Sequence, residues 1–137
     1  MSISTSVTSE PANAAAYAAL SWTAIGSINN LGEYGDESQV LTATALDIFR
    51  IWKGKGPRDA GTLQLVVLDR YDDTGQVALI AAQATTFMYP FKITLPNRLT
   101  TGGTDQIDYF VAYVVSQRLA PGSATNIVMR KIGRAHV

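Results

Sequence analysis

The residues that most readily suggest chemistry are a single histidine and a scattering of serines and aspartates. His136 is the only histidine of the chain. A Ser-His-Asp triad would have to use it as its base, and the chain lacks the Gly-x-Ser-x-Gly turn that presents a nucleophilic serine. Because no acid–base set can be assembled, we predict no catalytic residue and no enzyme.

Three aspartates around Tyr71 resemble a site for a hard cation. A calcium loop needs alternating oxygen ligands and a glutamate about twelve residues from the first, and no such glutamate follows Asp69, Asp72 and Asp73. These acids precede a helical segment, so Asp72 or Asp73 is better explained as a helix cap that accepts a hydrogen bond from the first turn. We therefore predict no metal site.

Cofactor and nucleic-acid motifs are equally weak. The short stretches "GKG" and "TGG" do not lead into a helix with Lys-Ser/Thr, as a phosphate loop would. Tyr109 and Tyr113 could stack on bases, but tyrosines on a strand face belong more often to a core or an interface. We predict no cofactor.

The composition indicates one globular domain of 137 residues, of which 47% are hydrophobic. The chain shows no membrane-length apolar run and no secretory signal, and it has no cysteine, which fits assembly in a reducing cytosol. Eleven basic residues balance eleven acidic ones. No bulk positive field is present to hold DNA.

The first half of the chain predicts an arm and a hairpin. Residues 1–20 are rich in Ser, Thr and Ala and predict a flexible arm, with the folded domain beginning at Ser21. Residues 21–28 alternate as in a strand, and a solvated loop follows over 29–38. We expect a strand over 40–52 with both faces covered, a Gly-rich turn over 53–61, and a strand over 62–69 whose Leu63, Leu65 and Val67 share one face.

The second half predicts one helix and three strands. Residues 72–85 form the helix, with an apolar stripe of Val77, Ile80, Ala81 and Ala84. Strands are expected over 91–96, 106–119 and 124–131; in the first, Phe91, Ile93 and Leu95 share a face, and in the second, Ile107, Tyr109, Val111, Tyr113 and Val115 do. The fold class is mainly β, a sandwich or barrel with one flanking helix.

Charges of opposite sign are separated along the first half of the chain. Acidic residues lie in one loop (Glu33, Asp36, Glu37), and basic residues gather in the following segment (Arg50, Lys53, Lys55, Arg58). Two interpretations stay open: two ordinary solvated loops, or an acidic patch that meets a basic patch on another copy. Head-to-tail contact of this kind builds rings or filaments, so these seven residues are our candidates for contacts between subunits.

The stretch "TATALDIFRIWKGKGPRDAGTLQLVVLDRYDDTGQVALIAAQ" (42–83) resembles the tail tube (major tail) proteins of long-tailed bacteriophages. The resemblance rests on a Thr/Leu-rich strand, a Lys-Gly turn, an Asp-x-Gly step into a "TLQL" strand, and an acidic cap before a helix. "YPFKITLPN" (89–97) and "DYFVAYVVSQRL" (108–119) also lie where that family places such strands. The likeness covers roughly residues 20–130.

This resemblance implies a β-sandwich or half-barrel whose copies form hexameric rings that stack into a tail tube. The genome would leave the virion through this tube, sliding past a lumen that does not bind it specifically. A loop within residues 32–46 would reach the next ring, and the N-terminal arm could do the same. Implied partners are copies of the chain and other tail proteins, with no membrane, and assembly would take place in the host cytoplasm.

Other classes remain open at this point. A tail terminator or a secretion-system tube protein would share the architecture and differ in whether stacking continues. A stand-alone β binding module, for instance for carbohydrate, usually shows a surface row of aromatic residues, whereas Trp22 and Trp52 stand in apolar strands and are expected to be buried or at an interface.

The last residues, "KIGRAHV", raise a separate question. "IGRAHV" is what a common short-read sequencing adapter encodes in one reading frame, and the adapter's next codon in that frame is a stop. We therefore interpret residues 132–137 as non-native and the folded domain as 21–131, cut short in its last strand. A genuine short basic tail is the alternative. On the first interpretation His136 is not part of the protein.

Overall fold

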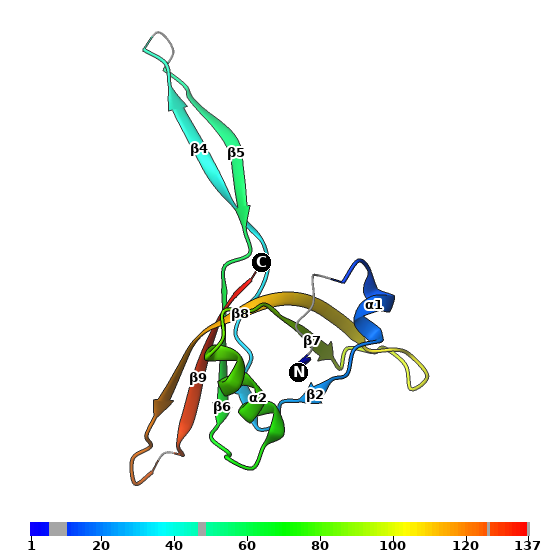
Figure 1. Ribbon diagram of the computed structural model, residues 1–137. Helices are drawn as coiled ribbons and strands as arrows, with labels where there is room; N and C mark the ends of the chain where they lie inside the picture. The colour runs from blue at the N-terminus through cyan, green and yellow to red at the C-terminus, as the bar shows by residue number, and fades with distance from the viewer. Residues whose placement is uncertain (6–10, 47–48, 126, 137) are drawn as a thin grey trace.

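The computed structural model describes residues 1–5, 11–46, 49–125 and 127–136. The protein is mainly β, and the described residues form nine strands and two helices (Figure 1). In chain order these are β1 (Ser2–Ile3), α1 (Ala14–Ala18), β2 (Thr23–Ala24), β3 (Ile28–Asn30), β4 (Glu37–Thr44), β5 (Ile51–Asp59), β6 (Thr62–Leu68), α2 (Thr74–Gln83), β7 (Tyr89–Leu95), β8 (Gln106–Ala120) and β9 (Met129–His136).

Seven strands form one antiparallel sheet, in the order β2-β1-β7-β8-β9-β6-β3. The two edge strands, β2 and β3, are separated by residues 25–27 alone. Four Cα steps span at most about 15 Å, whereas seven flat strands would be about 29 Å wide. The sheet must therefore curl until its edges approach each other, which corresponds to the half-barrel of the two alternatives, β-sandwich or half-barrel, that the resemblance implies.

The core lies on the inner face of this curled sheet. Leu63, Leu65 and Val67 of β6 are at most 2% exposed, as are Phe91 and Ile93 of β7. Both strand faces predicted by alternation are thus confirmed. Helix α2 packs against β1, β2 and β8 and adds Leu79 and Ala82 to the same cluster.

The face of β8 that lies in the core is not the face that carries its tyrosines. Phe110, Ala112 and Val114 belong to the core. On the opposite face, Tyr113 is 38% and Val115 is 52% exposed. Both faces of this strand are apolar, so alternation alone does not say which one meets the helix.

Helix α2 is confirmed within the predicted segment, but the predicted apolar stripe is wrong. Val77 is 51% exposed and Ala81 and Ala84 are exposed; the buried residues are Gly75, Gln76, Leu79 and Ala82. The glycine explains this orientation, because a Cβ at Gly75 would collide with the backbone of residues 24 and 25. Only the face without a side chain can approach that segment so closely.

The predicted flexible arm is wrong for the described part of residues 1–20. Strand β1 pairs with both β2 and β7, and Ile3 and Ser4 are fully buried. Helix α1 begins at its cap Asn13, whose side chain accepts a hydrogen bond from Ala16 N, and it buries Tyr17. Without β1, strand β7 would have one unpaired edge. The two residues of β1 cover that edge, and this pairing anchors the N-terminal segment to the sheet.

A hairpin is present, but β4 and β5 form it, and it lies earlier in the chain than the hairpin predicted from strands over 40–52 and 62–69. Strand β4 pairs with β5, so the chain turns between these two strands, and most of the predicted turn over 53–61 belongs to β5, which ends at Asp59. The expected continuous strand over 40–52 is therefore wrong, and so is its burial, because Ile51 and Trp52 are 57% and 64% exposed. The glycines and proline of this segment are tolerated because β5 has solvent on its other side.

Strand β9 begins at Met129, later than the predicted 124–131, and pairs with β6 and β8. Ile132 lies opposite Leu65 and is 1% exposed. The adapter-like stretch thus supplies most of this strand, and Val137 lies outside the described residues. Its non-native origin stays a prediction, which a genomic read across the codon for Lys131 would test.

Candidate assembly surfaces

The most prominent feature of the molecule is the β4–β5 hairpin, residues 37–59, which we call the arm. It forms its own two-stranded sheet and extends away from the curled sheet (Figure 1). Nine residues of β5 at about 3.3 Å each make it roughly 30 Å long. An isolated two-stranded hairpin is marginal in water, so the arm needs a surface to pack on.

The two sides of the arm differ in chemistry. Cross-strand pairing places Thr42 opposite Lys53 and Val40 opposite Lys55, which gives one side a basic character. Ala43 opposite Trp52 and Leu41 opposite Gly54 form the other side, which we call the apolar side. Leu41 and Trp52 are 55% and 64% exposed. Such a side is suited to lie on another protein surface.

The end of the arm is apolar as well. Leu46 and Phe49, at its turn, are fully exposed. Together with the apolar side of the arm, these two side chains enlarge the exposed apolar surface of the hairpin.

The residues of the two predicted charge patches lie on or beside the arm. Glu33, Asp36 and Glu37 precede or begin β4 at the arm's base, and Arg58 lies opposite Ser38 close by. Lys53 and Lys55 stand further along β5, and Arg50 lies at the turn. All seven residues are exposed, and within the described part of the chain no ion pair joins them.

The base of the arm is fixed to the sheet by Tyr34. Its hydroxyl donates a hydrogen bond to Asp108 Oδ2 over 2.7 Å, and its ring stacks on Phe110 with 6.4 Å between centroids. The bond raises the pKa of Tyr34, and it lowers the pKa of Asp108, to which Gln106 also donates. The direction in which the arm leaves the body therefore depends on this contact.

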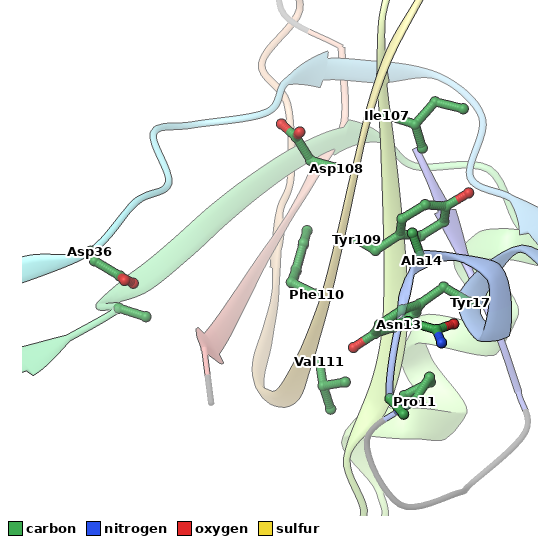
Figure 2. Close-up of a pocket in the computed structure, with 12 residues that line it drawn as sticks. Pro11, Asn13, Ala14, Tyr17, Asp36, Ile107, Asp108, Tyr109, Phe110 and Val111 are labelled. Atoms are coloured by element: carbon green, nitrogen blue, oxygen red, sulfur yellow. The ribbon is translucent and has the colours of Figure 1, made fainter.

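An open hollow lies next to this base, between α1 and the first half of β8. Figure 2 shows Asn13 and Tyr17 on one side of it and Ile107, Tyr109 and Val111 on the other. The ring of Tyr109 stacks on Tyr17, with 5.2 Å between ring centroids, and lies tilted against Trp22 at 5.8 Å, so it belongs to a packed aromatic cluster. Tyr109 is thus a packing residue, which was the favoured interpretation.

The two predicted helix-cap residues have different roles. Asp73 is the cap, since its side chain accepts from Gln76 N, and it also accepts from Gly26 N over 3.0 Å. Asp72 pairs instead with Arg70 over 2.8 Å, on the surface. Asp69 pairs with Arg130. All three aspartates thus have structural partners.

Residues 1–5, 11–46, 49–125 and 127–136 contain no cluster of three or more His, Cys, Asp or Glu that could hold a metal ion. Among the same residues, no helix combines the length and apolar character needed to cross a membrane.

A curled antiparallel sheet with a helix on its inner face and a long projecting hairpin defines a tail-tube type of fold. The chain is similar to the solved SPP1 tail tube, a hybrid structure from solid-state NMR and cryo EM, with a TM-score of 0.70 at 15% identity. The match covers 99% of this chain and 71% of that one. No family model and no curated protein matches the chain.

Sequence reasoning missed three parts of these surfaces. The apolar side of the arm was assigned to a covered strand, and Tyr34 was counted as part of a solvated loop. The signal for the arm was present in the alternation of Leu41 and Ala43 with Thr42 and Thr44. The third part is a set of exposed apolar side chains at the end of the body away from the arm: Tyr71, Leu119, Ile127 and Val128.

Proposed function

We propose that the chain is a structural protein of a phage tail, which forms hexameric rings that stack into the tail tube. The observation that carries this proposal is the fold likeness to the SPP1 tail tube, which extends over 99% of the chain. A second support is the arm, a projecting ribbon with exposed apolar residues at its turn and on one side. Such a ribbon fits a subunit that is completed by its neighbours.

In this proposal the arm makes the contact between rings. The loop expected to reach the next ring, within residues 32–46, contains β4, and the projecting element extends on through β5 to Asp59. The candidate contact residues on and beside the arm are Glu33, Asp36, Glu37, Arg50, Lys53, Lys55 and Arg58. Heterologous contacts of this kind close within a ring and continue between rings.

The tube would serve as the conduit for DNA ejection. Eleven basic and eleven acidic residues leave no net charge, so the lumen would offer few cationic contacts that retain phosphates. DNA would pass without specific binding. The role is structural and not enzymatic, the location is the virion, and assembly with other tail proteins would occur in the host cytoplasm.

Electron microscopy of the purified protein tests this function. Long tubes with six-fold rings in end view are the expected result. Single rings that never stack would favour another ring component, such as a tail terminator. A protein that stays monomeric at every concentration and salt would overturn the proposal in favour of a stand-alone β module.

A further inference from the structure

The arm leaves the body through two short segments, which we call its roots: residues 31–36 before β4 and residues 60–61 after β5. Every residue of β4 and β5 except Ser38 and Gly56 is exposed, and neither strand packs substantially on another described helix or strand. The direction of the arm relative to the sheet is therefore decided at the two roots.

Each root contains a glycine with a positive φ. Gly35 has φ +155° and Gly61 has φ +66°, conformations that residues with a side chain rarely adopt. A Cβ built on either glycine would meet no atom within 4 Å. Crowding by a neighbour therefore does not explain these glycines, and the backbone conformation does.

Open space lies beside both roots. A hollow of about 310 Å³ is lined by residues 33–35 and 60–62, which belong to the roots and the start of β6. The larger hollow beside α1 also has Asp36 on its wall, across from Tyr17 (Figure 2). The first cross-strand pair of the arm sets Glu37 opposite Asp59, and like charges weaken such a pair. The roots therefore have room to change direction.

The contact of Tyr34 with the sheet limits this freedom. Tyr34 directly precedes Gly35 and follows Leu31, which packs on the core. Its hydroxyl donates to Asp108 Oδ2 over 2.7 Å, and its ring stacks on Phe110. The first root is thus tied to β8 at the residue next to its glycine.

The acceptor of this bond is itself held in place. The second oxygen of Asp108 accepts from Gln106 Nε2 over 3.0 Å. Asn97 holds Gln106 from two sides, since its side chain donates to Gln106 Oε1 and accepts from Gln106 N, both over 3.0 Å. A chain of side chains that starts at the end of β7 therefore orients the carboxylate toward Tyr34.

We propose that the base of the arm is a hinge with a latch: the arm pivots about Gly35 and Gly61, and the contact of Tyr34 with Asp108 holds it in the direction seen here. With the latch closed, the arm has one direction. With the latch open, the backbone turns at the two glycines and the arm samples many directions. This inference concerns the unassembled chain and goes beyond the proposed function.

Distances between two spin labels test the latch. The chain has no cysteine, so Thr44→Cys near the end of the arm and Ala81→Cys on α2, both at exposed positions, supply the labelling sites. Pulsed electron paramagnetic resonance, with labelled chain diluted into unlabelled chain, reports distances within one copy. The chain with Tyr34 intact should give a narrow distribution. Tyr34→Phe should broaden it and lower the ratio of closed to open latches roughly tenfold, because a hydrogen bond to a charged group is worth about that factor.

Two further variants control this result. Tyr71→Phe removes the same hydroxyl from a tyrosine that is 96% exposed, and it should leave the narrow distribution unchanged. Gln106→Ala keeps the Asp108 carboxylate but removes its support, so it should broaden the distribution to a smaller extent than Tyr34→Phe. Circular dichroism checks that every variant is folded.

The hinge is tested by a matched pair at one glycine. Asparagine adopts a φ near that of Gly61 at little cost, whereas valine must leave this region. Gly61→Asn should therefore keep the mean distance, and Gly61→Val should shift it. An unchanged mean in Gly61→Val would show that the arm does not pivot there and would overturn the hinge.

Two results would overturn the latch. A broad distribution with Tyr34 intact would show that no latch is closed, and a distribution as narrow in Tyr34→Phe would show that none is needed. If the chain forms tubes, Tyr34→Phe should slow their growth roughly tenfold, because fewer arms have the closed direction; growth at the wild-type rate would overturn this consequence, which rests on the proposed function. A chain that forms no tubes but shows the expected distances would remove the proposed function and leave the hinge and latch standing.

Discussion

Asp73 Oδ2 accepts a hydrogen bond from Gly26 N over 3.0 Å, and this bond joins helix α2 to the segment between the two edge strands of the sheet. The other oxygen of the same carboxylate caps the helix at Gln76 N. A Cβ at Gly26 would collide with this carboxylate, so glycine is needed for the approach. One side chain thus closes the half-barrel and starts the helix that fills it.

Replacing Asp73 by Ala should therefore lower the free energy of unfolding by roughly 2–3 kcal/mol, because a cap and a second backbone bond are both lost. Urea denaturation followed by circular dichroism measures the change. Asp72→Ala is the matched control on the neighbouring residue. Its exposed pair with Arg70 should contribute less than about 1 kcal/mol, and an equal loss in both variants would contradict this assignment.

Gln76 is 1% exposed, and its amide is fully engaged. Nε2 donates to Leu68 O at 2.9 Å and to Gly26 O at 3.3 Å, while Oε1 accepts from Arg70 N. Gln76→Leu should destabilise the fold by roughly 2–4 kcal/mol, because these backbone groups would stay buried without partners. Thermal melting of Gln76→Leu and of Gln76→Glu measures this loss of stability. If Gln76→Leu melted at the wild-type temperature, the hydrogen bonds of the Gln76 amide would not contribute to stability as proposed.

The orientation of α2 is tested by truncating one residue on each side. Leu79→Ala should cost about 2–5 kcal/mol, since Leu79 is fully buried in the core. Val77→Ala should be within about 0.5 kcal/mol of wild type, since Val77 is half exposed and alanine favours the helix. If chemical denaturation showed a larger loss of stability for Val77→Ala than for Leu79→Ala, the apolar stripe predicted from the sequence would be correct after all.

The Tyr34–Asp108 bond gives the arm's base a pH dependence. Because the pKa of Asp108 is lowered in the fold, the stability it adds is complete above about pH 4 and is lost as the pH falls through the lowered pKa. The raised pKa of Tyr34 acts in the other direction: its contribution is complete below about pH 10 and is lost as the pH rises through the raised value.

Tyr34→Phe removes the hydroxyl and keeps the ring on Phe110. Carboxyl NMR titration should then show the pKa of Asp108 moving up toward its ordinary range, although Gln106 still holds it partly down. An unchanged Asp108 titration in this variant would show that the hydroxyl is not its main partner. Asp108→Asn should bring the Tyr34 pKa down in the same way, measured by absorbance in alkali.

Charge on the arm should matter for assembly and not for folding. Lys53→Glu with Lys55→Glu should impair tube formation and leave the melting temperature of the monomer unchanged, because both side chains are exposed without an ion pair to another described residue. Negative-stain microscopy gives the readout, and Arg98→Glu in the β7–β8 loop is the control. Normal tubes from the double variant would remove these lysines from the contact.

Local patterns in the sequence were sufficient wherever one face of a strand is apolar and the other polar. Phe91 and Ile93 identify their own buried face because Lys92 and Thr94 alternate with them. The helix over 72–85 and its acidic cap followed from the same kind of local signal. Each of these depends on residues within about ten positions of one another.

Predictions failed where both faces are apolar or where a partner far away in the chain decides. The arm was misplaced because its apolar residues, which are exposed to solvent in a projecting hairpin, give it the composition of a buried strand. The N-terminal segment was taken for a flexible arm because nothing within it indicates that β1 completes the sheet beside β7.

The sequence by itself determined the mainly β class, the second helix with its acidic cap and the separation of charges along the chain, and it carries the resemblance to tail tube proteins. Only the tertiary structure decided which surfaces are left to be covered. Strand pairing, a long-range property, sends the arm to one end and gathers Tyr71, Leu119, Ile127 and Val128 at the other. The same apolar residue types occur in the core and on the exposed surface. An exposed apolar side chain can therefore be recognised only after the core is known.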